Sequence, residues 1–252
     1  MSDSKKDFVV ALGGSSIYPN EIDVEYLKQF YNFICDRIKK GMRFVIVIGG
    51  GALARKFQNA ASQVNKVSDE DKDWIGIHAT RLNAHLLRTI FFKEADPVIM
   101  DSRGKLKDFD SHAIIIGAGW RPGWSTDFVA VQIATDFGLK QTIILGKPEY
   151  VFDKDPSFAP PSLKLRRASK AIASKHQKFP EAKPFKNLSW DEYLKLIPND
   201  WSPGIHAPVD PIAAKLAQSQ NLEVIVASGA DLENFKKILD GGKFKGTVIK
   251  NN

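Results

Sequence analysis

Three consecutive glycines and a nearby arginine form the most informative stretch of the sequence. Residues 45–57, VIVIGGGALARKF, pass from an apolar β-branched segment through Gly49, Gly50 and Gly51 into a helical pattern that carries Arg55 on its first turn. Glycine allows a ligand to approach the backbone closely, and the start of a helix presents unpaired N–H groups that favour an anion. A phosphate is therefore the first ligand that this pattern indicates.

Two common phosphate loops do not fit this stretch. The P-loop requires a Gly-Lys-Ser/Thr run after a four-residue spacer, and no such run follows Gly49. The dinucleotide fingerprint is matched loosely by Gly49-x-Gly51-x-x-Ala54, but it also needs an acidic residue about 20 positions further on, at the end of the next strand. The acids near that spacing instead lie in a polar stretch that leads into another helix: Asp69, Glu70, Asp71 and Asp73. A nicotinamide or flavin enzyme is not favoured.

Two other predicted strands also end in glycine. Residues 8–12 run into Gly13, Gly14 and Ser15, and residues 113–116 run into Gly117-Ala118-Gly119. In an open parallel sheet, ligands bind outside the carboxyl ends of the strands, so the three loops are expected to gather at one edge. Three anion-binding loops at one edge suggest a chain of phosphates.

Charged residues follow these loops at predicted helix starts. Ser125 or Thr126 is expected to cap a helix, which places Asp127 in its first turn, where a carboxylate is favoured electrostatically. Asp210, which precedes a proline, is expected to cap a later helix that carries Lys215. In the structural interpretation, Asp127 only stabilises the start of its helix, and Lys215 is only a solvated surface lysine. In the functional interpretation, Asp127 faces the phosphates and orients cationic donors or a metal, since phosphoryl transfer depends on positioning and charge neutralisation.

The elements that must position these residues alternate between strands and helices. Short apolar or β-branched runs recur at residues 8–12, 43–48, 97–100, 113–116, 141–145 and 223–227. Several are apolar throughout, as strands buried on both faces are. Their alternation with helices predicts an α/β protein with a mostly parallel sheet and helices on both sides.

One predicted helix is unusually long. It runs from about residue 72 to residue 94, and its large apolar residues recur at spacings of three, four and seven. The stripe that they form is expected to be a core face or a dimer face, with Ile75, Leu82, Leu86 and Ile90 as its members.

Composition bounds the class of protein. The chain has 252 residues, of which 43% are hydrophobic and 26% charged, as in ordinary globular domains. No apolar run reaches 18 residues, and the opening residues MSDSKKDF lead into a short strand, so a cytoplasmic protein is expected. Cys35 is the single cysteine, and a small buried core residue is expected there.

The excess of positive charge is local. Lysine and arginine exceed the acids by seven, 36 against 29, and residues 163–183 alone hold seven basic residues against Glu181. The rest of the chain is almost neutral, so no nucleic-acid or membrane partner is expected, and the segment is predicted to be a solvated insertion. Steering of polyphosphate ligands is the functional alternative for this segment.

The order of the motifs resembles the amino acid kinase family, and within it the archaeal-type uridylate (UMP) kinases. The matching pieces span nearly the whole chain in family order: LGGS at 12–15, GGGALARK at 49–56, DWIGIHATRLNA at 73–84, PGWSTD at 122–127, YVFDKDP at 150–156, DPIAAK at 210–215 and GTVI at 246–249. The resemblance implies a single three-layer αβα domain over residues 1–252, with a basic insertion at about 160–186. It also implies transfer of the γ-phosphoryl group of ATP, with Mg²⁺, to UMP, and a homo-oligomer, either dimer or hexamer.

On the ATP side, the resemblance implies roles by motif position. The transferring phosphates would be held by Gly13, Gly14 and Ser15. Asp127 would organise the catalytic cations, and Lys215 would neutralise charge on the transferring phosphoryl group. Gly14 and Gly50 complete the implied catalytic set, and no residue is assigned as a metal ligand. An aromatic and acidic loop would flank the ATP nucleoside, with Tyr150, Phe152 and Asp155 as its contacts.

On the UMP side, the second glycine run would line the gap between donor and acceptor, through Gly49, Gly50 and Gly51. Arg55 would bind the UMP phosphate, because a planar guanidinium can meet two phosphate oxygens at once. Asp73 would take the ribose hydroxyls. The uracil side would be formed by the loop that contains Gly119, Ser125 and Thr126.

The chain departs from the family pattern at several positions. Ala11 stands where many members have a lysine, so Lys215 or another basic group must supply more of the charge neutralisation. Residues 146–150, GKPEY, replace the usual Asn/Thr-x-x-Asp-Gly pattern near the adenine, and Trp120 and Trp124 are bulkier than the residues expected in the acceptor loop.

Two other functions are compatible with the same fold. A non-catalytic nucleotide- or anion-binding or storage protein is favoured by Ala11 and disfavoured by the presence of both Asp127 and Lys215. A kinase of another small phosphorylated substrate, such as isopentenyl phosphate, would carry a histidine shortly after the glycine run, and Arg55 in this region favours a nucleotide instead.

Overall fold

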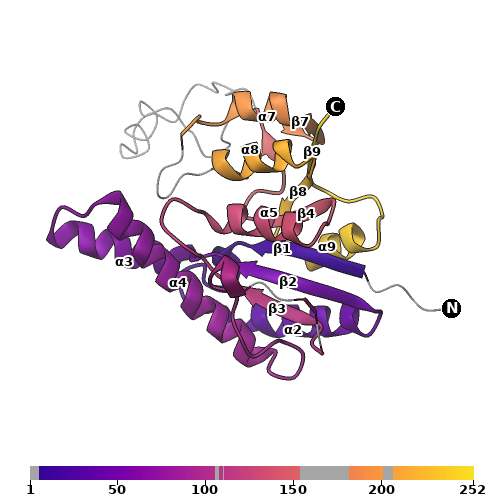
Figure 1. Cartoon of the computed structure of the whole chain (residues 1–252), viewed down its shortest axis with the longest axis horizontal. Helices are drawn as coiled ribbons and strands as arrows, with labels where there is room; N and C mark the ends of the chain where they lie inside the picture. The colour runs from indigo at the N-terminus through magenta and orange to yellow at the C-terminus, as the bar shows by residue number, and fades with distance from the viewer. Residues whose placement is uncertain (1–5, 106–107, 110, 154–181, 201–206) are drawn as a thin grey trace, which may run out of the picture.

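The computed structural model describes residues 6–105, 108–109, 111–153, 182–200 and 207–252 (Figure 1). Its main sheet has seven strands in the order β3-β2-β1-β4-β8-β9-β7. Their bounds are β1 Lys6–Leu12, β2 Met42–Ile48, β3 Ile114–Gly117, β4 Gln141–Gly146, β7 Asn187–Ser189, β8 Glu223–Ser228 and β9 Thr247–Lys250. Only the β8–β9 pair is antiparallel among these strands. The predicted mostly parallel sheet is confirmed. A second sheet pairs β5, Val151–Phe152, with β6, Pro184–Phe185.

Helices cover both faces of the main sheet, which confirms the expected three-layer αβα sandwich. One face packs against α2 (Val24–Ile38), α4 (Asp69–Ile90) and α9 (Leu232–Leu239). The other packs against α5 (Thr126–Asp136), α7 (Trp190–Leu196) and α8 (Pro211–Ser219). Two further helices, α1 (Gly14–Ile17) and α3 (Gly51–Val64), and the short 3-10 turn η1 (Arg103–Lys105) complete the described elements. Alternate residues of a strand point to opposite faces, so Val9 joins the α5 side and Val10 the α2 side.

The strand register brings the glycine loops together. β1 pairs with β2 in parallel as far as Leu12 and Ile48, so the two chains leave the sheet side by side at Gly13 and Gly49. On the other side of β1, Leu12 is paired with Leu145 of β4. The carboxyl ends of the parallel strands therefore meet at one edge, as the sequence predicts.

Residues 97–100, predicted as a strand, do not form one. The segment makes only isolated bridges beside β3, through Ala95 and Met100. Pro97 has no N–H group to donate to a ladder, which confines the segment to the edge of the sheet beyond β3.

The long helix is confirmed as α4, and its predicted apolar stripe is divided between core and solvent: Leu86 and Ile90 are partly buried against the core on the α2 side of the sheet, but Leu82 is not. Leu82 is 62% exposed, whereas the buried face is formed by Ile77, Ala79, Thr80, Asn83, Ala84 and Leu87. Small and polar residues lie on the inner face because α4 packs close to glycine backbone, where large side chains do not fit. The dimer-face alternative remains for Leu82.

Several local predictions can be compared with the structure. Cys35 is only partly buried, because the inner face of α2 consists instead of Tyr26, Leu27, Phe30 and Ile34. Within the described ranges, no helix is both long enough and apolar enough to cross a membrane. Asp155 and most of the predicted basic insertion lie outside the described residues.

Candidate active site

The first two glycine corners contact each other directly through their backbones. A Cβ atom placed on Gly14 would lie 2.2 Å from the carbonyl oxygen of Gly49 and 2.5 Å from the nitrogen of Gly51. Gly51 also has a φ of 62°, a left-handed conformation that favours glycine. Only residues without side chains allow this approach, so the sequence requirement for glycine at both corners has a direct physical cause.

These corners present backbone donors without protein acceptors. Gly14 and Ser15 begin α1, and Gly50 and Gly51 begin α3. Among the described residues, none of these four amides has a hydrogen-bond acceptor, whereas the neighbouring amides of Gly13 and Gly49 bond to Leu145 and Leu12. Adjacent unpaired N–H groups at helix starts are an anion site. The geometry suits two phosphate groups held close together.

The third loop lies beside this pair but does not offer its amides to a ligand. The Gly119 amide donates to Thr80 Oγ1 at 2.8 Å, and the Ala118 amide donates to the Met100 carbonyl at 3.1 Å. Further along, the Gly123 amide donates to Asp73 Oδ2 at 2.8 Å. The prediction that this loop binds an anion through its glycines is wrong, because protein acceptors have already taken those donors. The loop, which carries Gly119, Ser125 and Thr126, instead lines one side of the candidate site, and we call it the Gly119 wall.

Sequence analysis missed Gly229 at the same edge, and it named Gly146 only as part of the altered loop near the adenine. Gly146 ends β4 and Gly229 follows β8, and the Gly229 amide donates to the Gly146 carbonyl at 2.9 Å. A Cβ on Gly229 would lie 2.6 Å from Ser16 Oγ, so this loop packs against the first corner. The Ser228-Gly229 pair after an apolar strand is the signal that could have found it.

Two carboxylates lie near the starts of α5 and α8. Ser125 caps α5 by accepting from the Phe128 amide at 3.0 Å, and its hydroxyl donates to Asp210 Oδ2. Asp210 caps α8 through the amides of Ile212 and Ala213 at 2.8 and 3.1 Å. The predicted caps at Ser125 and Asp210 are confirmed. The Asp210 carboxylate therefore joins the starts of both helices.

Asp127 differs from Asp210 in its surroundings. It accepts no hydrogen bond from the described residues, although it lies in the first turn of α5, as predicted. Burial, and then the negative charge of Asp210, raise the pKa of Asp127 to about 8. Burial also raises the pKa of Asp210, but three hydrogen bonds to that carboxylate oppose the shift. Asp127 is thus the carboxylate whose charge lacks a partner, and a bound cation would supply one.

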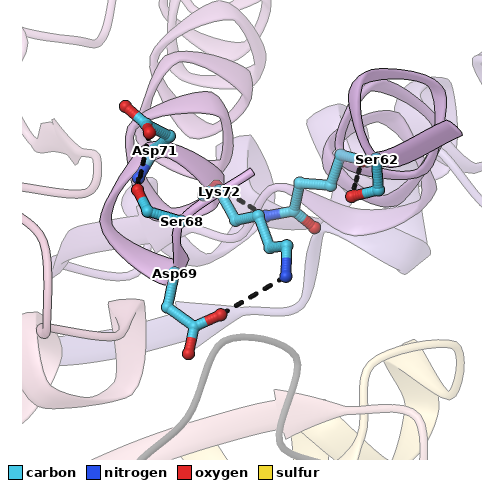
Figure 2. A network of polar contacts seen from close by, with 6 residues as sticks. Ser62, Ser68, Asp69, Asp71 and Lys72 are labelled. Carbon is cyan, nitrogen blue, oxygen red and sulfur yellow. Dashed lines mark hydrogen bonds and ion pairs between the residues drawn. The ribbon is translucent and has the colours of Figure 1, made fainter. Parts of the chain in front are cut away.

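Asp73 lies near the start of α4, which is fixed to α3. Figure 2 shows Ser68 and Asp71 in contact at the helix start and Asp69 paired with Lys72 at 3.3 Å. The Gln58 side chain of α3 donates to the Lys72 carbonyl at 2.8 Å. Burial raises the pKa of Asp73, and the hydrogen bond from Gly123 opposes that shift. Asp73 therefore connects α4 to the third loop.

The two basic residues singled out by the sequence are both exposed. Arg55 lies one turn beyond Gly51 on α3 and has no hydrogen bond or ion pair within the described part of the chain. Lys215 Nζ donates to the carbonyl of Asn199 at 3.1 Å, so the structure does not place it against the glycine corners. Tyr150 and Phe152 pack edge to face, with ring centroids 6.3 Å apart.

This combination defines a class of protein. A parallel sheet whose strand ends carry contacting glycine corners, unpaired amides and an unpaired carboxylate is an α/β binder of polyphosphate-bearing ligands. The model of the amino acid kinase family matches residues 6–173, and the chain belongs to that family.

Individual relatives are similar over nearly the whole chain. A uridylate kinase of Hyperthermus butylicus is 27% identical over 94% of this chain and 95% of its own. A uridylate kinase of Thermococcus kodakarensis is 28% identical over 96% of this chain and 98% of its own. Among solved structures, the uridylate kinase of Archaeoglobus fulgidus has a TM-score of 0.70 at 25% identity, covering 97% of this chain and 99% of that one. The UMP kinase of Bacillus anthracis shares the fold, with a TM-score of 0.69 at 21% identity and coverages of 98% and 96%.

A side chain at Gly14 should separate the two contacting corners. We expect Gly14→Ala to weaken binding of inorganic tripolyphosphate at least about tenfold and to lower stability by about 1–3 kcal/mol, as overpacking does. Calorimetry and urea unfolding measure the two effects. Gly104→Ala is the matched control, because no atom lies within 4 Å of a Cβ there. Unchanged tripolyphosphate affinity in Gly14→Ala would contradict the anion site.

The raised pKa of Asp127 makes stability depend on pH. With its pKa raised to about 8, Asp127 keeps its proton in the folded state up to that pH, whereas the unfolded chain releases it near the ordinary aspartate pKa of 3.8. Stability conferred by the protonated form is therefore lost as pH rises between these values. Asp127→Asn should remove that loss. The melting temperature of the variant should therefore rise relative to that of the unmodified protein as pH increases from 5 to 8.5. Glu233→Gln, an exposed carboxylate in the first turn of α9, should show no such gain. Parallel pH profiles for Asp127→Asn and the unmodified protein would refute this assignment.

Proposed function

We propose that this chain is a kinase that transfers the γ-phosphoryl group of ATP to UMP, giving UDP. The observation that carries the proposal is the contact between two glycine corners whose amides are unpaired, at Gly14–Ser15 and Gly50–Gly51. Two such corners in contact can hold a donor phosphate chain and an acceptor phosphate end to end. Near full-length similarity to uridylate kinases supports this pair of substrates.

On the donor side, Gly13, Gly14 and Ser15 would bind the transferring phosphates through the start of α1. Tyr150 and Phe152 would flank the nucleoside, since both are partly exposed beside the end of β4. Asp155 is proposed with them from the sequence alone. Lys215 would have to exchange its hydrogen bond to the Asn199 carbonyl for a phosphate oxygen, which an exposed lysine can do at little cost.

On the acceptor side, Arg55 would grip the UMP phosphate, because it is exposed and unpaired on the helix that begins at Gly51. Asp73 Oδ2 is occupied by the Gly123 amide, which leaves Oδ1 to accept from a ribose hydroxyl. The wall that carries Gly119, Ser125 and Thr126 would face the base. In this loop, Cζ of Arg121 lies 3.9 Å from the centroid of the Trp124 ring, and the stacked pair gives the wall an aromatic surface.

The residues present fit a magnesium ion that ATP carries with it. Among the described residues, no group of three or more His, Cys, Asp or Glu side chains lies close enough to hold a metal ion alone. Mg²⁺ commonly takes one or two carboxylates plus substrate phosphates, and Asp127 has a carboxylate to offer. When bound, the ion would neutralise charge that develops on the phosphates.

Position 11 makes this neutralisation more demanding. Ala11 is 2% exposed and packs in the core on the α5 side of the sheet. Position 11 therefore supplies no positive charge, so Lys215, Arg55 and the magnesium ion must supply it. The same observation favours the second candidate, a nucleotide-binding protein on this fold without catalysis.

We also propose one domain over residues 1–252, because β1 near the N-terminus and β8 and β9 near the C-terminus share a sheet. The basic insertion at about 160–186 would extend from it. An enzyme with these substrates would act in the cytoplasm, where both nucleotides are available.

We propose a homo-oligomer that uses the exposed face of α4 around Leu82. Leu82 on α4 and Phe57 on the adjoining α3 are each 62% exposed, and the two helices project together from one side of the sheet (Figure 1). Exposed large apolar side chains on neighbouring helices are typical of protein interfaces.

The substrate assignment is tested with ATP and magnesium against UMP, CMP, AMP and isopentenyl phosphate. UMP should be the best acceptor. Binding of UMP and ATP without UDP formation would favour the non-catalytic candidate, and turnover of isopentenyl phosphate alone would overturn the choice of a nucleotide.

Arg55 gives a sharper test of the acceptor side. Arg55→Ala should raise the KM for UMP by about tenfold to a hundredfold, since a charge-assisted hydrogen bond contributes about 1.5–3 kcal/mol, and leave the KM for ATP nearly unchanged. Arg55→Lys should recover only part of the loss, because lysine keeps the charge but not the bidentate contact. Equal effects on both substrates would contradict the assigned role.

Leu82→Glu tests the oligomer. Light scattering should show the unmodified protein as a dimer or hexamer and the variant shifted towards smaller species. Asn32→Glu, at an exposed position on α2 and not on α3 or α4, is the control and should not change the mass. A monomeric unmodified protein would exclude this proposal.

A further inference from the structure

Two buried polar side chains lie on the inner face of α4. Thr80 is 6% exposed and Asn83 is 3% exposed. They are three positions apart, so they lie on the same side of the helix. Burying a hydroxyl or an amide costs free energy unless hydrogen bonds replace those made to water. Their partners therefore indicate why these residues occupy a core position.

Asn83 bonds to the second glycine corner. Its Nδ2 donates to the Gly49 carbonyl at 2.8 Å and lies 3.4 Å from the Gly50 carbonyl. In a trans peptide unit the C=O and N–H groups point in opposite directions. By holding the Gly49 carbonyl towards α4, Asn83 aims the Gly50 N–H away from α4. The Gly50 carbonyl and the Gly51 N–H point in opposite directions for the same reason. The N–H groups of Gly50 and Gly51 are two of the four unpaired amides.

Thr80 bonds to the third loop. Its hydroxyl donates to the Ile77 carbonyl at 2.6 Å, which leaves the oxygen to accept from the Gly119 amide at 2.8 Å. The donor and acceptor functions of this hydroxyl are thus both used. Thr80 fixes the wall of the acceptor side to the helix that holds the second corner.

The packing of α4 supports the same arrangement. A Cβ on Gly50 would lie 3.3 Å from the Gly76 carbonyl and 3.6 Å from Ala79 Cβ, so small residues of α4 lie against this corner. A Cβ on Gly119 would lie 3.0 Å from Thr80 Oγ1. The inner face of α4 therefore contacts both loops that surround the acceptor phosphate.

We propose that Thr80 and Asn83 are positioning residues for the acceptor, which set the direction of the Gly50 and Gly51 amides and the distance of the Gly119 wall. This inference rests on the proposed function. The two side chains would act through backbone and touch no substrate. No hydrogen bond joins either of them to the first corner among the described residues, so their effect should fall on UMP and spare ATP.

Thr80→Val and Thr80→Ser form the decisive pair. Valine keeps the shape of threonine but leaves the Gly119 amide without its acceptor, so the KM for UMP should rise about tenfold, as loss of one buried hydrogen bond implies, while the KM for ATP stays within about twofold. Serine keeps the hydroxyl and should restore a KM for UMP near that of the unmodified protein. Asn83→Leu removes the donor to Gly49 and should act in the same direction as Thr80→Val.

Leu87→Val is the control for lost stability. Leu87 is fully buried on the same helix and packs in the apolar core. Its shortening should lower the urea midpoint and leave both KM values unchanged. The proposal is overturned if Thr80→Val and Thr80→Ser lose UMP affinity equally, or if KM for UMP and ATP rise together.

The unmodified protein separates this inference from the proposed function. If it makes no UDP, the kinase proposal fails, and calorimetric binding of UMP and ATP to the same variants then tests Thr80 and Asn83. Weaker UMP binding by Thr80→Val, with ATP binding retained, would still support the positioning role. Absence of UMP binding to the unmodified protein would overturn both proposals.

Discussion

The close approach of two backbone corners is the constraint on which the rest of the structure depends. Parallel pairing of β1 and β2 up to Leu12 and Ile48 delivers both chains to the same point, about 4.8 Å apart, with no room for side chains. Because both chains then start a helix, their first amides cannot be paired within those helices. The same geometry that requires glycine therefore leaves unpaired amides at Gly14 on one chain and Gly51 on the other, which is what an anion site needs.

Two carboxylates lie near the starts of α5 and α8, and their surroundings differ. Asp210 accepts three hydrogen bonds from the starts of α5 and α8, which stabilise its charged form although burial still raises its pKa. Asp127 accepts none from the described residues and is repelled by Asp210. The surroundings of the two neighbouring carboxylates thus differ: Asp210 joins two helices, and Asp127 has no hydrogen-bond donor among the described residues. Under the proposed function, a cation carried by the phosphates would give the Asp127 carboxylate a partner.

Features set by local rules could be predicted from the sequence. Strands that run into glycine, and helix starts at Ser125 and Asp210, depend on residues within a few positions of each other. Features set by distant contacts could not be predicted. The amide of Gly119 is taken by Thr80, 39 positions earlier, and nothing in the local pattern of either segment shows it. The exposure of Leu82 could not be predicted for a similar reason, since periodicity finds large apolar residues but not the small ones, such as Ala79, that pack against glycine. The bond from Lys215 to the Asn199 carbonyl is likewise a contact that the local sequence does not show.

The two faces of α4 then have different tasks within one turn of helix. Leu82 faces outwards, and its neighbours Thr80 and Asn83 on either side hold two separate loops. A helix turn is stiff, because its backbone hydrogen bonds fix the residues relative to one another. A contact made at Leu82 would therefore affect the position of the turn that orients the Gly50 amide and the Gly119 wall. This explains why a long helix that contributes few large side chains to the core can still determine the geometry at the sheet edge: it acts through hydrogen bonds to backbone instead of through buried apolar area.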